Sequence, residues 1–78
     1  MVDREMELRH LVAAERHVLD AHVRIARLGA LIDYAAAMGQ PTTTAREMLA
    51  SMRDVLVSFV AHRDAIARAL KGMPAGAP

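Results

Sequence analysis

Apolar residues recur with the period of an α-helix along the first half of the chain, from about residue 3 to residue 38. They lie three and four residues apart, a spacing that gathers side chains on one face of a helix. The stripe consists of Leu8, Leu11, Glu15, Val18, His22, Ile25, Gly29 and Ile32, and it is widened by Val12, Leu19 and Ala30. An alternation of three and four is typical of antiparallel helix pairs and coiled coils, so we expect this face to pack against a second helix.

A second helix is predicted from about residue 44 to residue 71. Gly39 and Pro41 end the first helix, because glycine suits the left-handed residue after a helix and proline prevents continuation, which leaves residues 39–43 as the turn. Thr44 and Glu47 have the spacing of a capping box. The second seam consists of Leu49, Met52, Leu56, Phe59, Arg63, Ile66 and Leu70. Gly72 and Pro74 end this helix, and residues 73–78 are expected to form a disordered tail.

The predicted fold class is therefore all-α, a two-helix antiparallel hairpin over residues 1–72. The short connector forces the two helices to run in opposite directions. A single hairpin leaves much of the wide apolar face of the first helix in water, whereas two hairpins packed as a four-helix bundle bury it. We expect a homodimer, in which a two-fold axis is the commonest symmetry.

Composition and charge narrow the possible classes of protein. The 78 residues make one small domain, and the absence of cysteine excludes disulfides and thiolate metal sites. The first residues alternate in charge where a signal peptide would have a basic cluster and an apolar run, and no apolar run approaches the roughly 20 residues of a membrane span. We expect a cytoplasmic protein without membrane contact. The net charge of +1 is low for a nucleic-acid-binding protein.

Three polar residues interrupt the predicted seams: Glu15, His22 and Arg63. With the turn centred near residue 41, Arg63 faces residue 19, so Glu15 and His22 lie about one turn to either side of it. We predict a hydrogen-bonded layer of the three, within one chain or across a dimer, that sets the alignment of the helices. The alternatives are a ligand or catalytic pocket, and a loosely packed seam from which Arg63 reaches water.

No cofactor and no metal site are predicted. Glu7 and His10 have the Glu-x-x-His spacing of di-iron bundles. Such sites need further carboxylates from the facing helix, and the only glutamate there is Glu47, at its far end.

Two short motifs, Ala14-Glu-Arg-His-Val18 and Ala61-His-Arg-Asp64, lie on either side of a Gly-Gln-Pro-Thr-Thr turn. In this arrangement the chain resembles a set of small bacterial proteins built as one helical hairpin. The resemblance implies the hairpin fold and a cytoplasmic setting, with no activity or ligand to carry across. The stretch from Ala30 to Ala37 is less polar here than in that set, which puts a shared surface near the turn in doubt.

The functional hypothesis is a non-catalytic protein–protein interaction module, or a small structural or regulatory subunit, that acts as a homodimer and contacts another protein. The alternative is a dimer that binds RNA or DNA through an outer basic face of Arg9, Arg16, Arg24 and Arg27. Asp20 interrupts that face and no aromatic residue there can stack on bases, which argues against nucleic acid. A small all-helical enzyme is the third hypothesis, but of the cationic residues only Arg63 is expected to point inward.

Overall fold

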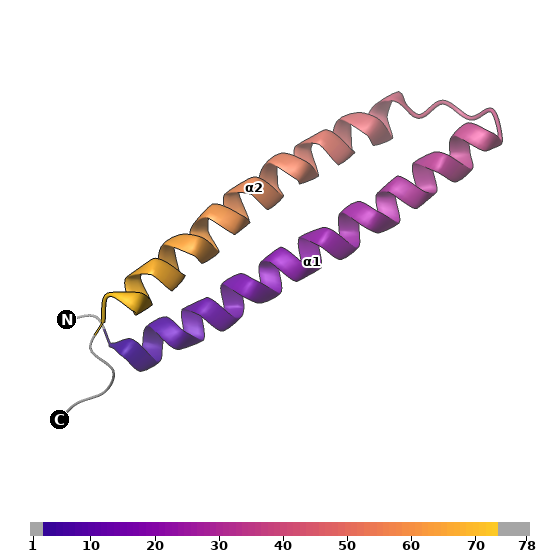
Figure 1. The fold of residues 1–78 in the computed structure, drawn as a ribbon. Helices are drawn as coiled ribbons and strands as arrows, with labels where there is room; N and C mark the ends of the chain where they lie inside the picture. The colour runs from indigo at the N-terminus through magenta and orange to yellow at the C-terminus, as the bar shows by residue number, and fades with distance from the viewer. Residues whose placement is uncertain (1–2, 74–78) are drawn as a thin grey trace.

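The computed structural model describes residues 3–73, which form two antiparallel helices joined by a short turn (Figure 1). The first helix, α1, spans Arg4–Ala37, and the second, α2, spans Thr43–Lys71. The described residues contain no strand, and the prediction of an all-helical hairpin is confirmed. Neither helix in this part of the chain has a stretch both long and apolar enough to cross a bilayer.

Local hydrogen bonds define both ends of α1. At the start, the carboxylate of Asp3 accepts a hydrogen bond from the backbone N–H of Glu5 at 3.1 Å, which satisfies one of the free donors of the first turn. At the end, Gly39 adopts the left-handed conformation with φ of 73°. Its N–H donates to the carbonyl of Ala36, and the N–H of Gln40 donates to the carbonyl of Ala35. This pair of bonds is the Schellman motif, and it confirms the predicted role of Gly39.

Gly39→Ala is therefore expected to destabilise the protein by about 1 kcal/mol, because an alanine pays a steric cost in the left-handed region. The matched control is Gly72→Ala. Gly72 follows α2 with φ of −81°, and an added Cβ there meets only ordinary van der Waals contacts. Urea denaturation at one protein concentration measures both variants, and equal losses would contradict the proposed difference in backbone conformation.

The start of α2 differs from the prediction. The N-cap is Thr42, and Thr44 already lies in the first turn, so the predicted capping box of Thr44 and Glu47 is wrong. The Thr42 side chain makes no bond to the backbone; its hydroxyl accepts a hydrogen bond from Nε of Arg46 at 2.8 Å. The first residue of α2 is Thr43, one residue before the predicted start, because the neighbouring threonines are as compatible with a helix start as Thr44 is.

The seam between the helices was predicted correctly for α2 and only in part for α1. On α2, every residue of the predicted seam is buried or half-buried. On α1, Leu11, Val18, Ile25 and Ile32 pack as predicted and Gly29 is half-buried, but Leu8, Glu15 and His22 are exposed, and the residue before each of them is buried or half-buried instead. The α1 seam alternates between those residues and Glu7, Ala14, Ala21, Leu28 and Ala35.

Around residues 15 and 22, the shift on α1 has a physical reason in side-chain size and polarity. Ala14 and Ala21 are buried and let the helices approach closely, whereas Glu15 and His22 remain exposed on the adjacent face. Two overlapping three-and-four patterns share the same branched residues on α1, and only the position of α2 selects one of them. Charged groups stay in water when a small apolar residue is available for the seam.

The hydrophobic core is thin and is best closed at the end of the rod where α1 begins and α2 ends (Figure 1). Ala14, Ile66 and Leu70 form its buried cluster, and Leu11 and Met73 pack against it. Met73 was predicted to belong to a disordered tail and is instead half-buried here; residues 74–78 lie outside the described part. The radius of gyration is 17.9 Å, whereas a compact domain of this length has about 11.5 Å. The molecule is a rod with two long open sides.

Candidate interaction surface

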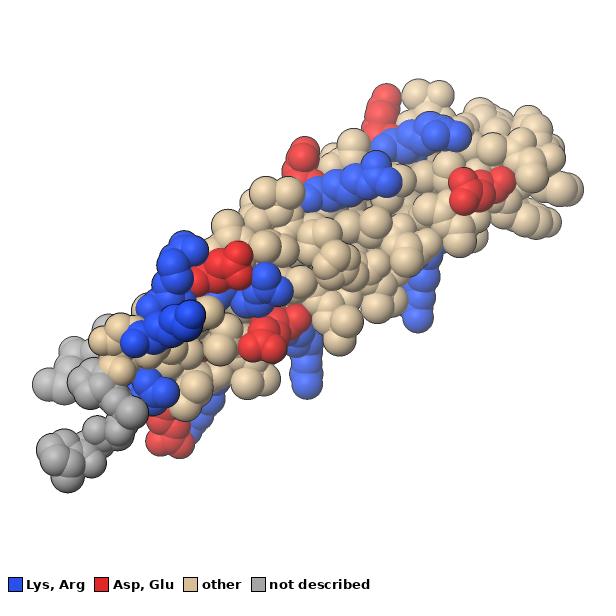
Figure 2. All heavy atoms as spheres, in the orientation of Figure 1, with Lys and Arg blue, Asp and Glu red and all other residues tan. Residues whose placement is uncertain are grey.

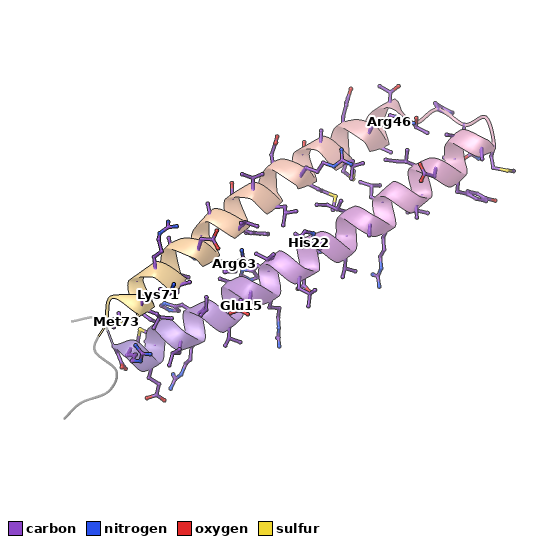
Figure 3. All side chains as sticks on the ribbon, in the orientation of Figure 1. Glu15, His22, Arg46, Arg63, Lys71 and Met73 are labelled. Atoms are coloured by element: carbon purple, nitrogen blue, oxygen red, sulfur yellow. The ribbon has the colours of Figure 1, made fainter. Side chains whose placement is uncertain are left out.

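One of the two open sides, which we call the front face, faces the viewer in Figures 1–3. Because a helix turns by a constant angle per residue, the residue that directly follows each seam residue in sequence lies on this side of both helices. From α1 these are Leu8, Val12, Glu15, Leu19, His22, Ala26, Gly29 and Asp33, and from α2 they are Arg46, Ala50, Arg53, Val57, Val60, Asp64, Ala67 and Lys71. Figure 2 shows this side as a band of uncharged surface between scattered charged side chains.

Large apolar side chains on the front face lie in water. Val12, Leu19 and Val57 are 64%, 63% and 69% exposed. By contrast, the buried residues of the described chain include two alanines and no large side chain that is fully buried. Small residues, among them Ala26, Gly29 and Ala50, lie between the large ones and leave room for a partner helix to approach. The front face therefore has the composition of a protein interior whose packing partner is another molecule.

Glu15, His22 and Arg63 all line one shallow hollow of the front face, of about 450 Å³. In Figure 3, Glu15 and His22 extend from α1 and Arg63 from α2 near the middle of the hairpin. Glu15 and His22 are exposed and Arg63 is half-buried. Arg63 donates from Nε and Nη2 to Oδ1 of its neighbour Asp64, at 3.1 and 2.9 Å. The three residues converge, but within one described chain they do not form a buried layer; burial of that layer across a dimer stays a prediction.

Charge is divided between the two helices of the front face. The charged residues that α1 places there are the acids Glu15 and Asp33, and the exposed Arg16 also lines the hollow beside Glu15. From α2 come Arg46, Arg53 and Lys71, together with the Arg63–Asp64 pair. In Figure 3, Arg46 and Lys71 lie toward opposite ends of α2. Sequence reasoning missed Asp33, Arg46, Arg53 and Lys71, because it singled out polar residues inside the predicted seams and these four lie outside them.

The opposite side of the rod, the back face, combines a hollow near an aromatic contact with exposed apolar side chains near the turn. A second hollow of about 320 Å³ lies there, lined in part by His17, Met52 and Phe59. The rings of His17 and Phe59 are 5.4 Å apart and tilted, a contact between an exposed imidazole and a half-buried aromatic residue. Nearer the turn, four exposed apolar side chains follow: Leu31, Tyr34, Met38 and Met48.

The predicted outer basic face of α1 consists of separate, exposed side chains. Arg9, Arg16, Arg24 and Arg27 are all in water, and Arg9 pairs with Glu5 at 3.2 Å. Arg24 lines the hollow of the back face beside Asp20. This intermixture of charges lowers the positive potential that phosphate binding needs, and the geometry gives nucleic-acid binding no particular support.

Metal-ligating side chains do not gather in the described part of the chain. Nδ1 of His10 lies 3.1 Å from Oε1 of Glu7, so the Glu-x-x-His pair seen in the sequence does meet. Among residues 3–73, however, no group of three or more His, Asp or Glu side chains is placed to hold a metal ion. The Glu7–His10 contact is a local pair on one helix.

The geometry defines an elongated all-α hairpin with two open sides. Comparison with known proteins adds no relative to this description: no protein-family model, no curated protein and no solved structure matches the chain.

Proposed function

We propose that this protein is a non-catalytic interaction module that acts as a homodimer, in which two hairpins form a four-helix bundle. The observation that carries the proposal is the exposure of large apolar side chains along the whole rod, including Leu19 and Val57. The chain exposes 6109 Å², whereas a compact monomer of 8.5 kDa exposes about 4,700 Å². A partner helix pair along one open side covers such residues and supplies the core that one hairpin lacks.

The geometry supports a binding role better than a catalytic one. The titratable residues that come together, Glu15, His22 and Arg63, lie in a shallow, open hollow, and two of them are exposed. A catalytic site gains most from groups held in a water-excluded cavity. When one open side is used for the dimer, the other remains available, and the apolar residues near the turn on the back face are the proposed contact for a second protein.

Sedimentation equilibrium tests the dimer directly. We expect the mass to approach twice the 8.5 kDa of one chain as the protein concentration rises. Thermal unfolding, followed by circular dichroism, is expected to shift to higher temperature over the same concentration range, because dimerisation is linked to folding by mass action. A mass of one chain at every concentration, with an unfolding temperature independent of concentration, would contradict the proposal.

A further inference from the structure

The division of charge on the front face restricts how two copies can meet there. The α1 edge carries the acids Glu15 and Asp33 against one base, Arg16, and is net acidic. The α2 edge is net basic through Arg46, Arg53 and Lys71, because Arg63 and Asp64 neutralise each other. A face with one acidic and one basic edge is complementary to itself when the opposite edges are brought together. The two helices lie side by side along the full rod, so the two edges run parallel to each other (Figures 1 and 3).

Two symmetric arrangements bring two front faces into contact. If the two-fold axis runs parallel to the helices, α1 of each copy lies on α2 of the other, and the two turns are at the same end. If the axis runs across the helices, α1 lies on α1 and α2 on α2, and the turns are at opposite ends. The first arrangement places acid against base at both contacts, and the second places like charges together, which is unfavourable.

We infer that the front face binds the front face of a second copy about a two-fold axis parallel to the helices, so that α1 meets α2 of the other chain. Every neighbouring pair of helices in this bundle is then antiparallel. The inference rests on the homodimer proposed above and specifies its surface and its symmetry.

The register of the hairpin places the acids of one copy at the same height along the helix axis as basic residues of the other copy. Ala14 packs with Ile66, and Leu11 packs near Leu70, so residues that lie level on the two helices have numbers that add up to about 80. The same relation holds between chains when the axis is parallel to the helices. Glu15 then lies within about 3 Å of level with Arg63 of the other copy, and Asp33 within about 2 Å of level with Arg46, at 1.5 Å per residue.

The apolar residues of the front face fit the same register. Leu19 is level with the segment of the second copy that contains the exposed Val57 and the half-buried Val60. Glu15, His22 and Arg63, which only share an open hollow in one chain, become the central polar layer between two chains. Hydrogen bonds between a guanidinium and a carboxylate are strong when water is excluded, and they favour one alignment over others.

Spin labels on single cysteines distinguish the two arrangements, because the chain contains no cysteine of its own. A label at Gln40→Cys, in the turn, is expected to lie within about 30 Å of its copy, since adjacent helices are about 10 Å apart. The arrangement with the axis across the helices separates the same labels by about 50 Å, the length of α1. A label at Val23→Cys, near the middle of α1, gives a short distance in both and serves as the control for dimer formation.

A charge-reversal experiment identifies the face. In the double variant Glu15→Lys/Asp33→Lys both edges of the front face are basic, and we expect its dimer dissociation constant to rise at least tenfold at low salt. Mixing it with Arg46→Glu/Arg63→Glu is expected to restore a dimer made of one chain of each kind. The control Asp20→Lys/Asp54→Lys makes the same change in net charge at exposed positions outside the front face, and it should dimerise like the unmodified protein.

The outcomes separate the two proposals. A short distance at residue 23 with a long one at residue 40 would overturn the inferred symmetry and leave the homodimer in place. Equal effects of the two double variants on dimerisation would overturn the choice of face. A monomer by sedimentation, with no measurable coupling at either label, would overturn both the homodimer and the inference built on it.

Discussion

Leu19→Glu is expected to convert the dimer into monomers at micromolar concentration, with a dissociation constant raised at least about 100-fold. Leu19 is 63% exposed in a single hairpin, so the new carboxylate of the monomer lies in water. In the dimer the same carboxylate is buried against Val57 and Val60 of the second copy, and the one guanidinium near that level, Arg63, already pairs with Glu15, so each dimer contains two surplus buried carboxylates. A buried unpaired charge costs several kcal/mol, of which about 2.7 kcal/mol accounts for a 100-fold change.

Leu31→Glu is the matched control for this prediction. Leu31 is the same residue type on the same helix and is 64% exposed, but it lies on the back face. The two variants therefore differ only in the side of the rod that carries the new charge. Sedimentation equilibrium should show dissociation for Leu19→Glu and a dimer for Leu31→Glu. The reverse result would place the dimer contact on the back face, and loss of the dimer in both would show that neither side alone forms it.

Ile66→Ala is expected to lower the free energy of unfolding by about 2–3 kcal/mol. Ile66 is 8% exposed and packs with Ala14 and Leu70 in the buried cluster near the end of α2. Truncation removes apolar contacts and leaves a cavity that the short side chain of Ala14 does not fill, and isoleucine-to-alanine changes in cores cost about 2–5 kcal/mol. The lower part of that range applies because the core is narrow and its surroundings can relax.

Urea denaturation at one fixed concentration measures the effect, with Leu31→Ala as the control on an exposed leucine. The control should change stability by no more than about 0.5 kcal/mol. The concentration must be the same for all variants, because the unfolding of a dimer depends on it. A loss for Ile66→Ala as small as that of the control would mean that the Ala14, Ile66 and Leu70 cluster adds little to the stability of the hairpin.

Some of the structural features behind these predictions follow from the sequence alone, and others do not. The position of Ile66 in the core follows from periodicity alone, because the three-and-four spacing of α2 predicted its seam residue by residue. The left-handed Gly39 was also predicted, since few residues other than glycine adopt that conformation at low cost. The N-cap of α2 was assigned wrongly, to Thr44 in place of Thr42, because Thr42, Thr43 and Thr44 are chemically alike and the choice among them depends on where the turn ends.

The apolar stripe on α1 is wide enough to contain two seams, and the sequence alone does not determine which of them packs against α2. Both seams share Leu11 and Val18; one continues through Ala14 and Ala21 and the other through Glu15 and His22. The contact with α2 selected the alanines, because small side chains allow close packing and the polar residues keep their hydration. Glu15, His22 and Arg63 were thus recognised as unusual from the sequence, but the surface on which they meet was not.

The sequence by itself determined the two helices, their antiparallel order and the residues that α2 turns inward, because local propensity and the period of 3.6 residues act within each helix. Only the tertiary structure decided which half of the α1 stripe is buried and which half remains open. That choice depends on contacts between residues of α1 and α2 that are far apart in sequence, and it is the reason that acidic residues of α1 and basic residues of α2 share one face.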